Sequence, residues 1–291
     1  MNFKVISPRT IKELLGVITS QQGAQFRFGA GYSDLLLELK KQPIEDLTVI
    51  NLAYLTDTQI NSIEVLGDGI KIGVQVTANT LTSDVNIRTQ YPVLHEAASQ
   101  LASRQIRQVA TVGGNLCTAS PAGDLGCALV ALKAQCEILS AQGTIRTISL
   151  EDFFTGVRKT VLQSDELLYS VFVPSNDEGK EICSHFIKIG TRNAMEIAIV
   201  SLAYHFQLSD DKITSAGAAI GSVAPVIKFV GEACEFLKGK SFSNVSPKTA
   251  SEFAAKVGSY ASPISDIRAS DWYRSEVLYN ISKSIFEKSL E

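Results

Sequence analysis

The chain has 291 residues, a length that exceeds most single hydrophobic cores and suits two or three domains. Apolar residues make up 45% of it and charged residues 20%, with 8 Pro and 20 Gly, which excludes disordered, collagenous and coiled-coil proteins. The 27 Lys and Arg residues against 30 Asp and Glu residues give a net charge of -3, whereas a nucleic-acid-binding protein needs a basic excess to neutralise phosphates.

The N-terminus and the uncharged stretches predict neither export nor membrane insertion. Charges at Lys4, Arg9 and Lys12 interrupt the first residues, which have no apolar segment typical of a secretory signal. The longest uncharged stretches, residues 108–123 and 213–227, are rich in Gly, Ala, Ser and Thr, whereas a membrane span needs about 20 predominantly apolar residues. We therefore expect a cytoplasmic protein without a membrane span.

The first 55 residues alternate strand-like and helix-like segments. Ser7-Pro8 precedes apolar residues at helical spacing in residues 11–18, which predicts a helix start. Residues 25–29 predict a short strand, residues 33–41 a helix and residues 47–51 a second strand. This pattern predicts a compact βαβ unit over residues 1–55.

Residues 56–174 predict antiparallel strands mixed with helices. Two hairpins are expected, the first with its turn at Gly67-Asp68-Gly69. Their strands fall in residues 63–66 and 70–74, and in residues 136–140 and 144–148. Helices are expected over residues 81–87, 92–103 and 125–132, and residues 107–115 predict a strand that leads into a double-glycine turn. The polar stretch 173–180, which contains Pro and Gly, predicts a domain boundary.

Residues 180–291 predict a three-stranded antiparallel sheet covered by helices. The expected strands are residues 185–189, 197–208 and 213–222, and the expected helices are residues 229–238, 247–260 and 270–288. The chain as a whole therefore belongs to the α+β class. No metal site is expected, because the five cysteines form no Cys-x-x-Cys pair and none of the three histidines has a partner at ligand spacing.

Two glycine turns are candidates for binding a phosphate group. In residues 28–34 a strand passes into a helix through small residues, which exposes backbone N–H groups at a helix N-terminus. In residues 111–115 the adjacent Gly113 and Gly114 let the backbone approach a ligand and can form a nest of N–H donors, to which Asn115 adds a donor and an acceptor. Either turn alone also fits a purely structural turn or bulge, but together they favour a ligand with phosphates between them.

Charge and spacing narrow the kind of phosphate site. Neither turn contains Lys or Arg, so backbone donors would meet most of the charge, with Arg104 and Arg107 as longer-range help. Asp34 would repel a phosphate and is expected to cap its helix or to accept from a sugar hydroxyl. A Walker loop is absent, and Asp34 stands where the fingerprint G-x-G-x-x-G needs its third glycine, which argues against an ordinary nicotinamide or ATP fold.

The run IRQVATVGGNLCTASPAGD, residues 106–124, closely resembles the second FAD-binding segment of the flavoprotein (medium) subunits of molybdenum hydroxylases. That family includes xanthine dehydrogenase, carbon monoxide dehydrogenase and aldehyde-oxidising relatives. Residues 31–34 also resemble the family's Gly-Gly-Thr-Asp. Further resemblances lie in residues 150–156, 165–168, 186–188, 192–197, 266–270 and 273–274. They cover nearly the whole chain in the expected order.

The resemblance implies FAD held between a small βαβ lobe, residues 1–55, and a larger mixed or antiparallel lobe, residues 56–174, with residues 180–291 as the C-terminal domain of the flavoprotein subunit. The absence of His from both glycine turns favours non-covalent binding. Around the pyrophosphate the family pattern places Phe28, Gly29, Ala30, Gly31, Tyr32, Ser33, Asp34, Leu35, Thr111, Val112, Gly113, Gly114 and Asn115. It places Thr118 and Asp124 toward the ribityl chain or the flavin, and Leu101, Leu168 and Lys188 close to the ring, and it counts Cys117 and Gly123 among the cofactor-binding residues. Tyr32 departs from the family's Gly or Asn, and a tyrosine at positive φ would be strained.

The function that the resemblance implies is electron transfer without a catalytic side chain. A [2Fe-2S] small subunit would deliver single electrons to the FAD, a molybdopterin large subunit would hold the substrate, and NAD or O₂ would take the electron pair. Two alternatives remain open. A stand-alone FAD-dependent oxidase or dehydrogenase would oxidise an organic substrate by itself, and a flavin-free assembly subunit is supported only by Tyr32.

Overall fold

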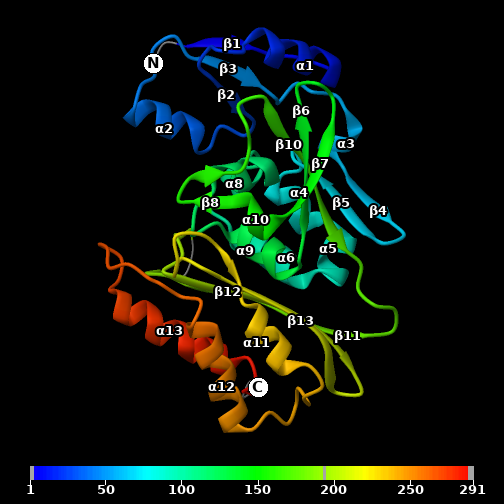
Figure 1. The fold of residues 1–291 in the computed structure, drawn as a ribbon, viewed down its shortest axis with the longest axis vertical. Coiled ribbons are helices and arrows are strands. Elements are labelled where there is room, and N and C mark those ends of the chain that lie inside the picture. The colour runs from blue at the N-terminus through cyan, green and yellow to red at the C-terminus, as the bar shows by residue number, and fades with distance from the viewer. Residues whose placement is uncertain (1–2, 193–194, 288–291) are drawn as a thin grey trace.

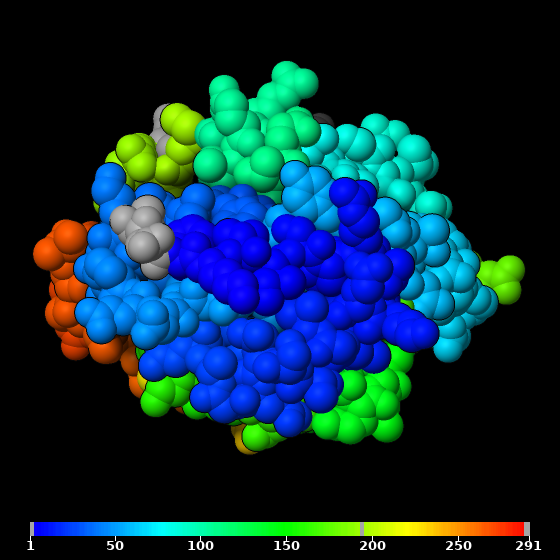
Figure 2. All heavy atoms as spheres, turned by 90° about the horizontal axis from the view of Figure 1, so that it is seen from above, coloured from blue at the N-terminus to red at the C-terminus, as the bar shows by residue number. Residues whose placement is uncertain are grey.

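The computed structural model describes residues 3–192 and 195–287, and its three larger sheets follow one another along the long axis of the molecule (Figure 1). The N-terminal sheet lies at one end, the five-stranded sheet in the middle and the C-terminal sheet toward the other end. Seen from above, the N-terminal residues extend across the middle of the face and later segments emerge around their rim (Figure 2).

The N-terminal region confirms the predicted alternation of strands and helices. Its elements are β1 (Lys4–Ile6), α1 (Ile11–Ser20), β2 (Phe26–Gly29), α2 (Leu35–Lys41) and β3 (Thr48–Asn51). The strands form a parallel sheet in the order β1-β3-β2. Because successive side chains of a strand point to opposite faces, Val49 packs with Leu39 of α2, while Ile50 joins Leu14 and Ile18 of α1 in the main core.

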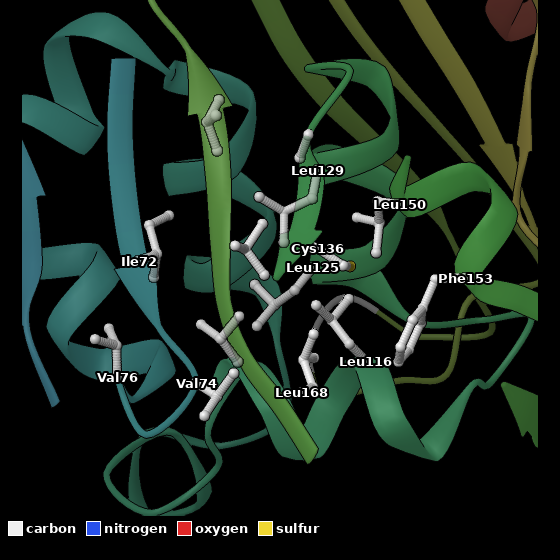
Figure 3. Close-up of a cluster of buried hydrophobic side chains, with 14 of the residues drawn as sticks. Ile72, Val74, Val76, Leu116, Leu125, Leu129, Cys136, Leu150, Phe153 and Leu168 are labelled. Atoms are coloured by element: carbon white, nitrogen blue, oxygen red, sulfur yellow. The ribbon is translucent and has the colours of Figure 1, made fainter. Parts of the chain in front are cut away.

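The middle region contains an antiparallel sheet in the order β4-β5-β10-β6-β7. Its strands are β4 (Ile63–Leu66), β5 (Gly69–Gly73), β6 (Gln135–Ser140), β7 (Ile145–Ser149) and β10 (Glu166–Pro174), and β8 (Phe154–Gly156) pairs separately with β9 (Lys159–Thr160). Both predicted hairpins are confirmed. Leu116, Leu125 and Leu129 pack against Ile72 and Leu168 of this sheet in the core (Figure 3).

Eight short helices lie in the same part of the described chain. They are α3 (Thr58–Asn61), α4 (Ala78–Ser83), α5 (Val85–Gln90), α6 (Pro92–Gln100), α7 (Arg104–Arg107), α8 (Val112–Thr118), α9 (Asp124–Ala131) and α10 (Leu150–Phe153). The single helix expected over residues 81–87 is two helices, because the Asp84 carboxylate accepts from the Ile87 N–H and starts α5.

The strand expected over residues 107–115 is wrong, since α7 and α8 occupy this stretch. Side-chain caps explain why this stretch is helical. Ser103 Oγ accepts from the Ile106 N–H, and Thr111 Oγ1 accepts from the Gly114 N–H at 3.0 Å. An N-cap satisfies donors that a helix start leaves open, and here it outweighs the β propensity of Val109 and Val112.

The C-terminal region confirms the three predicted antiparallel strands and adds a short fourth one. The order is β11 (Glu181–Ile189), β12 (Val200–Ser209), β13 (Lys212–Gly221) and β14 (Lys228–Phe229). The helices α11 (Gly231–Leu237), α12 (Pro247–Gly258) and α13 (Asp271–Ser284) cover the sheet on the side away from α6 and α9 (Figure 1). The last residue expected in α13, Lys288, lies outside the described residues. None of the helices described is both long and apolar enough to cross a membrane.

Candidate functional site

The turn between β2 and α2 presents a row of free backbone donors. The N–H groups of Ala30, Gly31, Tyr32 and Ser33 have no hydrogen-bond partner within the described part of the chain. Tyr32 adopts φ 58°, and its ring packs against the small core cluster of Leu39, Leu47 and Val49. This packing offsets the strain of the left-handed conformation, so the turn keeps its shape with a tyrosine.

Gly29 makes room for that arrangement. A Cβ at this position would lie 2.4 Å from the nearest atom of the Tyr32 ring. The ring therefore folds back over the glycine, and residues 30–33 are half-buried.

The second glycine segment is the first turn of α8, and its donors are already used. The N–H groups of Val112 and Gly113 bond to the carbonyl oxygens of Val76 and Val74 at 2.9 and 2.8 Å, and Thr111 accepts from Gly114. The nest of N–H donors expected here is therefore wrong, because tertiary hydrogen bonds occupy the same groups. What remains at the surface is Gly114, which is exposed and lets a ligand come close to the helix.

The two segments touch through their backbones. A Cβ on Gly31 would lie 1.8 Å from the carbonyl oxygen of Val109 and 2.6 Å from its carbonyl carbon. Only a glycine fits at such a contact. The free donors of residues 30–33 thus lie beside the start of α8, as a ligand with phosphates between the two turns requires.

Asp34 does not cap its own helix, contrary to one expectation. Its carboxylate makes no capping hydrogen bond in α2 and instead accepts from Thr118 Oγ1 at 3.3 Å and from the Arg158 guanidinium at 3.0 and 3.4 Å. Arg158 was missed by the sequence reasoning. The signal that could have found it is the missing cation: a phosphate site without Lys or Arg in either turn needs one from elsewhere.

A buried ion pair lies at the start of α9. Lys188 Nζ of β11 contacts Asp124 Oδ2 at 2.7 Å and donates to the Gln100 carbonyl oxygen at 3.3 Å. The two side chains are 3% and 7% exposed. The resemblance placed Asp124 toward the ribityl chain or the flavin and Lys188 close to the ring, and the structure pairs the two residues directly across the boundary between the middle and C-terminal regions.

Two buried oxygens near this pair lack partners. Asn115 Oδ1 and Asp124 Oδ1 accept no hydrogen bond in the described residues, and α9 begins without a side-chain cap. Buried polar atoms are nearly always satisfied, so these two acceptors beside a helix start are candidates for hydrogen bonds from a ligand with N–H or O–H groups. FAD carries both phosphates and such donors, and the residues present fit it.

The remaining residues predicted to bind the cofactor differ in their exposure. Phe28 is half-buried at the end of β2, Leu35 opens α2, Cys117 is exposed and Gly123 precedes α9. Leu101 and Leu168 are 8% and 1% exposed and belong to the main core. Arg107, expected to help at longer range, donates from Nη1 to the carbonyl oxygens of Leu101 and Ala102 at 3.0 and 3.1 Å. No group of three His, Cys, Asp or Glu side chains in the described ranges could hold a metal ion.

Asp124 is expected to titrate well above an ordinary aspartate in the FAD-free chain. Burial raises its pKa from 3.8 to about 6, although Lys188 opposes the shift. Because the folded pKa exceeds the unfolded one, this group's contribution to stability is full below pH 3.8 and is lost as the pH rises past about 6. Carboxyl ¹³C NMR should therefore show a titration near pH 6 that disappears in Asp124→Asn. A wild-type midpoint near 3.8 would contradict it.

Comparison with known proteins identifies the class of the chain. Residues 1–176 match the family described as the FAD binding domain in molybdopterin dehydrogenase, and residues 185–289 match the CO dehydrogenase flavoprotein C-terminal domain. The chain belongs to this family of FAD-binding oxidoreductase subunits, which confirms the resemblance of residues 106–124 and the expected FAD.

Individual relatives are similar over most of their length. The nicotine 6-hydroxylase medium subunit of Paenarthrobacter nicotinovorans is 28% identical over 92% of this chain and 90% of its own. The nicotinate dehydrogenase FAD-subunit of Eubacterium barkeri is 31% identical over 68% and 67%. The solved carbon monoxide dehydrogenase of Hydrogenophaga pseudoflava superposes with a TM-score of 0.89 over 97% of this chain and 95% of that one at 23% identity, which establishes the shared fold.

Proposed function

We propose that this chain is the electron-transfer flavoprotein subunit of a multi-subunit molybdenum hydroxylase. A [2Fe-2S] partner would supply electrons singly, and NAD or O₂ would accept them as a pair. The observation that carries the proposal is the contact of Gly31 with Val109, which sets four free N–H donors beside the glycine-rich start of α8. FAD, when bound, supplies the redox chemistry and the ability to convert single electrons into pairs.

The side chains are proposed to position the cofactor and to take no covalent part. The N–H groups of residues 30–33 would bind the pyrophosphate, as a nest of backbone donors does for an anion. The orphaned oxygens of Asn115 and Asp124 would accept from the ribityl chain or the flavin. Lys188 holds Asp124 in place and keeps a positive charge beside the site.

The same proposal assigns a role to each region of the chain. Residues 1–55 and 56–174 would act as the two FAD-binding lobes and residues 180–291 as the C-terminal domain. The separate sheets and the position of Lys188 on β11, opposite Asp124 on α9, support this division. The iron–sulfur and molybdopterin centres would lie on other polypeptides of a cytoplasmic complex.

The isolated chain is expected to bind about one FAD, which acid releases because no covalent link forms. Absorbance at 450 nm before and after acid precipitation measures both properties. A chain that stays colourless with excess FAD would favour the flavin-free assembly subunit. Turnover of an aldehyde or N-heterocycle by this chain alone would favour the stand-alone oxidase. Iron and molybdenum on other chains of the purified native complex would support the proposed assembly.

A further inference from the structure

Arg158 connects the two segments that form the candidate phosphate site. It lies in the turn between β8 and β9 with φ 56°, and its own N–H donates to the carbonyl oxygen of Ala119, directly after α8, at 3.0 Å. Its guanidinium reaches across to Asp34 at 3.0 and 3.4 Å and to Glu38 at 3.5 Å, both at the N-terminal end of α2. One residue thus holds the end of α8 by its backbone and the start of α2 by its side chain.

The charges around the free donors make this connection necessary. Asp34 follows the row of N–H groups at residues 30–33 directly, and Glu38 lies one helical turn further on. Two unneutralised carboxylates at this position would cancel the positive potential at the N-terminal end of α2 and would repel an approaching diphosphate. Neither glycine segment contains a Lys or Arg that could compensate.

The Asp34 carboxylate accepts hydrogen bonds from two side chains that lie near the end of α8. It accepts from Thr118 Oγ1 of α8 as well as from Arg158. Because both partners belong to the structure around the end of α8, the pair also fixes the distance between the first turn and α8. Arg158 is 52% exposed and Asp34 43% exposed, and an ion pair this exposed adds little to global stability.

We propose that Arg158 is a positioning residue for the cofactor: it neutralises Asp34 and Glu38 and ties the donor-bearing turn to α8, so that the turn accepts the FAD pyrophosphate. This inference rests on the proposed function. It extends that function to a residue outside both glycine segments.

The test is FAD affinity of the full-length chain, stripped of flavin, with FAD and riboflavin as the two probes. Arg158→Ala is expected to weaken FAD binding about 5- to 10-fold at low salt and less at 0.5 M NaCl, where the charges are screened. Riboflavin lacks the phosphates, so its affinity should change less than twofold by the same electrostatic argument. Arg158→Lys keeps the charge without the bidentate geometry and should lie between the two.

A second substitution separates charge from structure. Asp34→Asn in the Arg158→Ala background removes one of the two unneutralised carboxylates and should restore part of the lost FAD affinity. Arg146→Ala is the matched control, because it breaks the Arg146–Glu166 pair of β7 and β10 and should leave FAD affinity unchanged.

The outcomes are distinguishable. Wild-type affinity in Arg158→Ala, or a loss that Asp34→Asn does not recover, or an equal loss for riboflavin, would overturn the role given to Arg158 while leaving the proposed function intact. A wild-type chain that binds no FAD would overturn the proposed function and this inference together. If Arg158→Ala does not fold, the salt dependence of Arg158→Lys, compared with wild type, decides between the same outcomes.

Discussion

Replacing Gly31 by alanine is expected to abolish FAD binding while most of the fold survives. The added Cβ would lie 1.8 Å from the Val109 carbonyl oxygen, an atom of the backbone that no rotamer change can move. The turn must therefore retreat from α8 by about 1 Å or more, which takes the donors of residues 30–33 out of register with the pyrophosphate. We expect an affinity loss of at least about 100-fold, or roughly 2.7 kcal/mol.

The stability cost of this change should be moderate, about 1–3 kcal/mol, as for other overpacked positions. Flavin fluorescence titration and urea unfolding of the same preparation measure the two effects. Gly16→Ala is the matched control, because Gly16 lies in α1 of the same lobe and a Cβ there meets nothing within 4 Å. That control should bind FAD normally and be slightly more stable. Normal FAD affinity in Gly31→Ala would show that the cofactor does not use this contact.

Lys188→Met should destabilise the chain strongly and in a pH-dependent way. The substitution leaves the Asp124 carboxylate buried without its counter-charge, a situation that typically costs about 3–5 kcal/mol. Losing Lys188 also raises the pKa of Asp124 further, so at pH 5 the folded chain carries the neutral acid. The destabilisation should therefore be largest at pH 8 and roughly half as large at pH 5.

Urea unfolding at the two pH values is the measurement. Asp124→Asn added to Lys188→Met should recover much of the stability at pH 8, because it removes the uncompensated charge. Lys238→Met breaks an exposed pair with Glu235 and serves as the control, with an expected change below about 0.5 kcal/mol at either pH. Equal destabilisation at pH 5 and pH 8 would mean that lost packing, and not the buried charge, accounts for the effect.

The parts of the fold that local patterns determine could be predicted from the sequence. The turn at residues 67–69 fixes the β4–β5 hairpin, and alternating strands and helices define the N-terminal sheet. The prediction for residues 107–115 was wrong because two apolar β-branched residues favoured a strand, whereas Ser103 and Thr111 cap two helices. Capping depends on a single hydrogen bond each, which hydrophobic patterning does not reveal.

The contacts of the candidate site could be predicted only in part. The sequence predicted free N–H donors in both glycine segments, and the structure leaves them free only in residues 30–33. Only the folded chain shows that Val74 and Val76 use the donors of the second segment. Arg158 lies 124 residues from Asp34, and pairing over such a separation is a property of the tertiary structure.

The two faces of β3 have a consequence for how the molecule unfolds. Ile50, with Leu14 and Ile18, packs into the same core as the middle sheet, and only Leu39, Leu47 and Val49 form a cluster belonging to the N-terminal region itself. Three buried residues cannot balance the chain entropy of some fifty, so we expect the N-terminal region not to fold by itself. We expect its melting to be coupled to that of the middle region in a single cooperative transition. The contact between the turn of residues 30–33 and the segment before α8 then lies inside one folding unit, and we expect the turn to open locally at a lower free-energy cost than separation of the two regions.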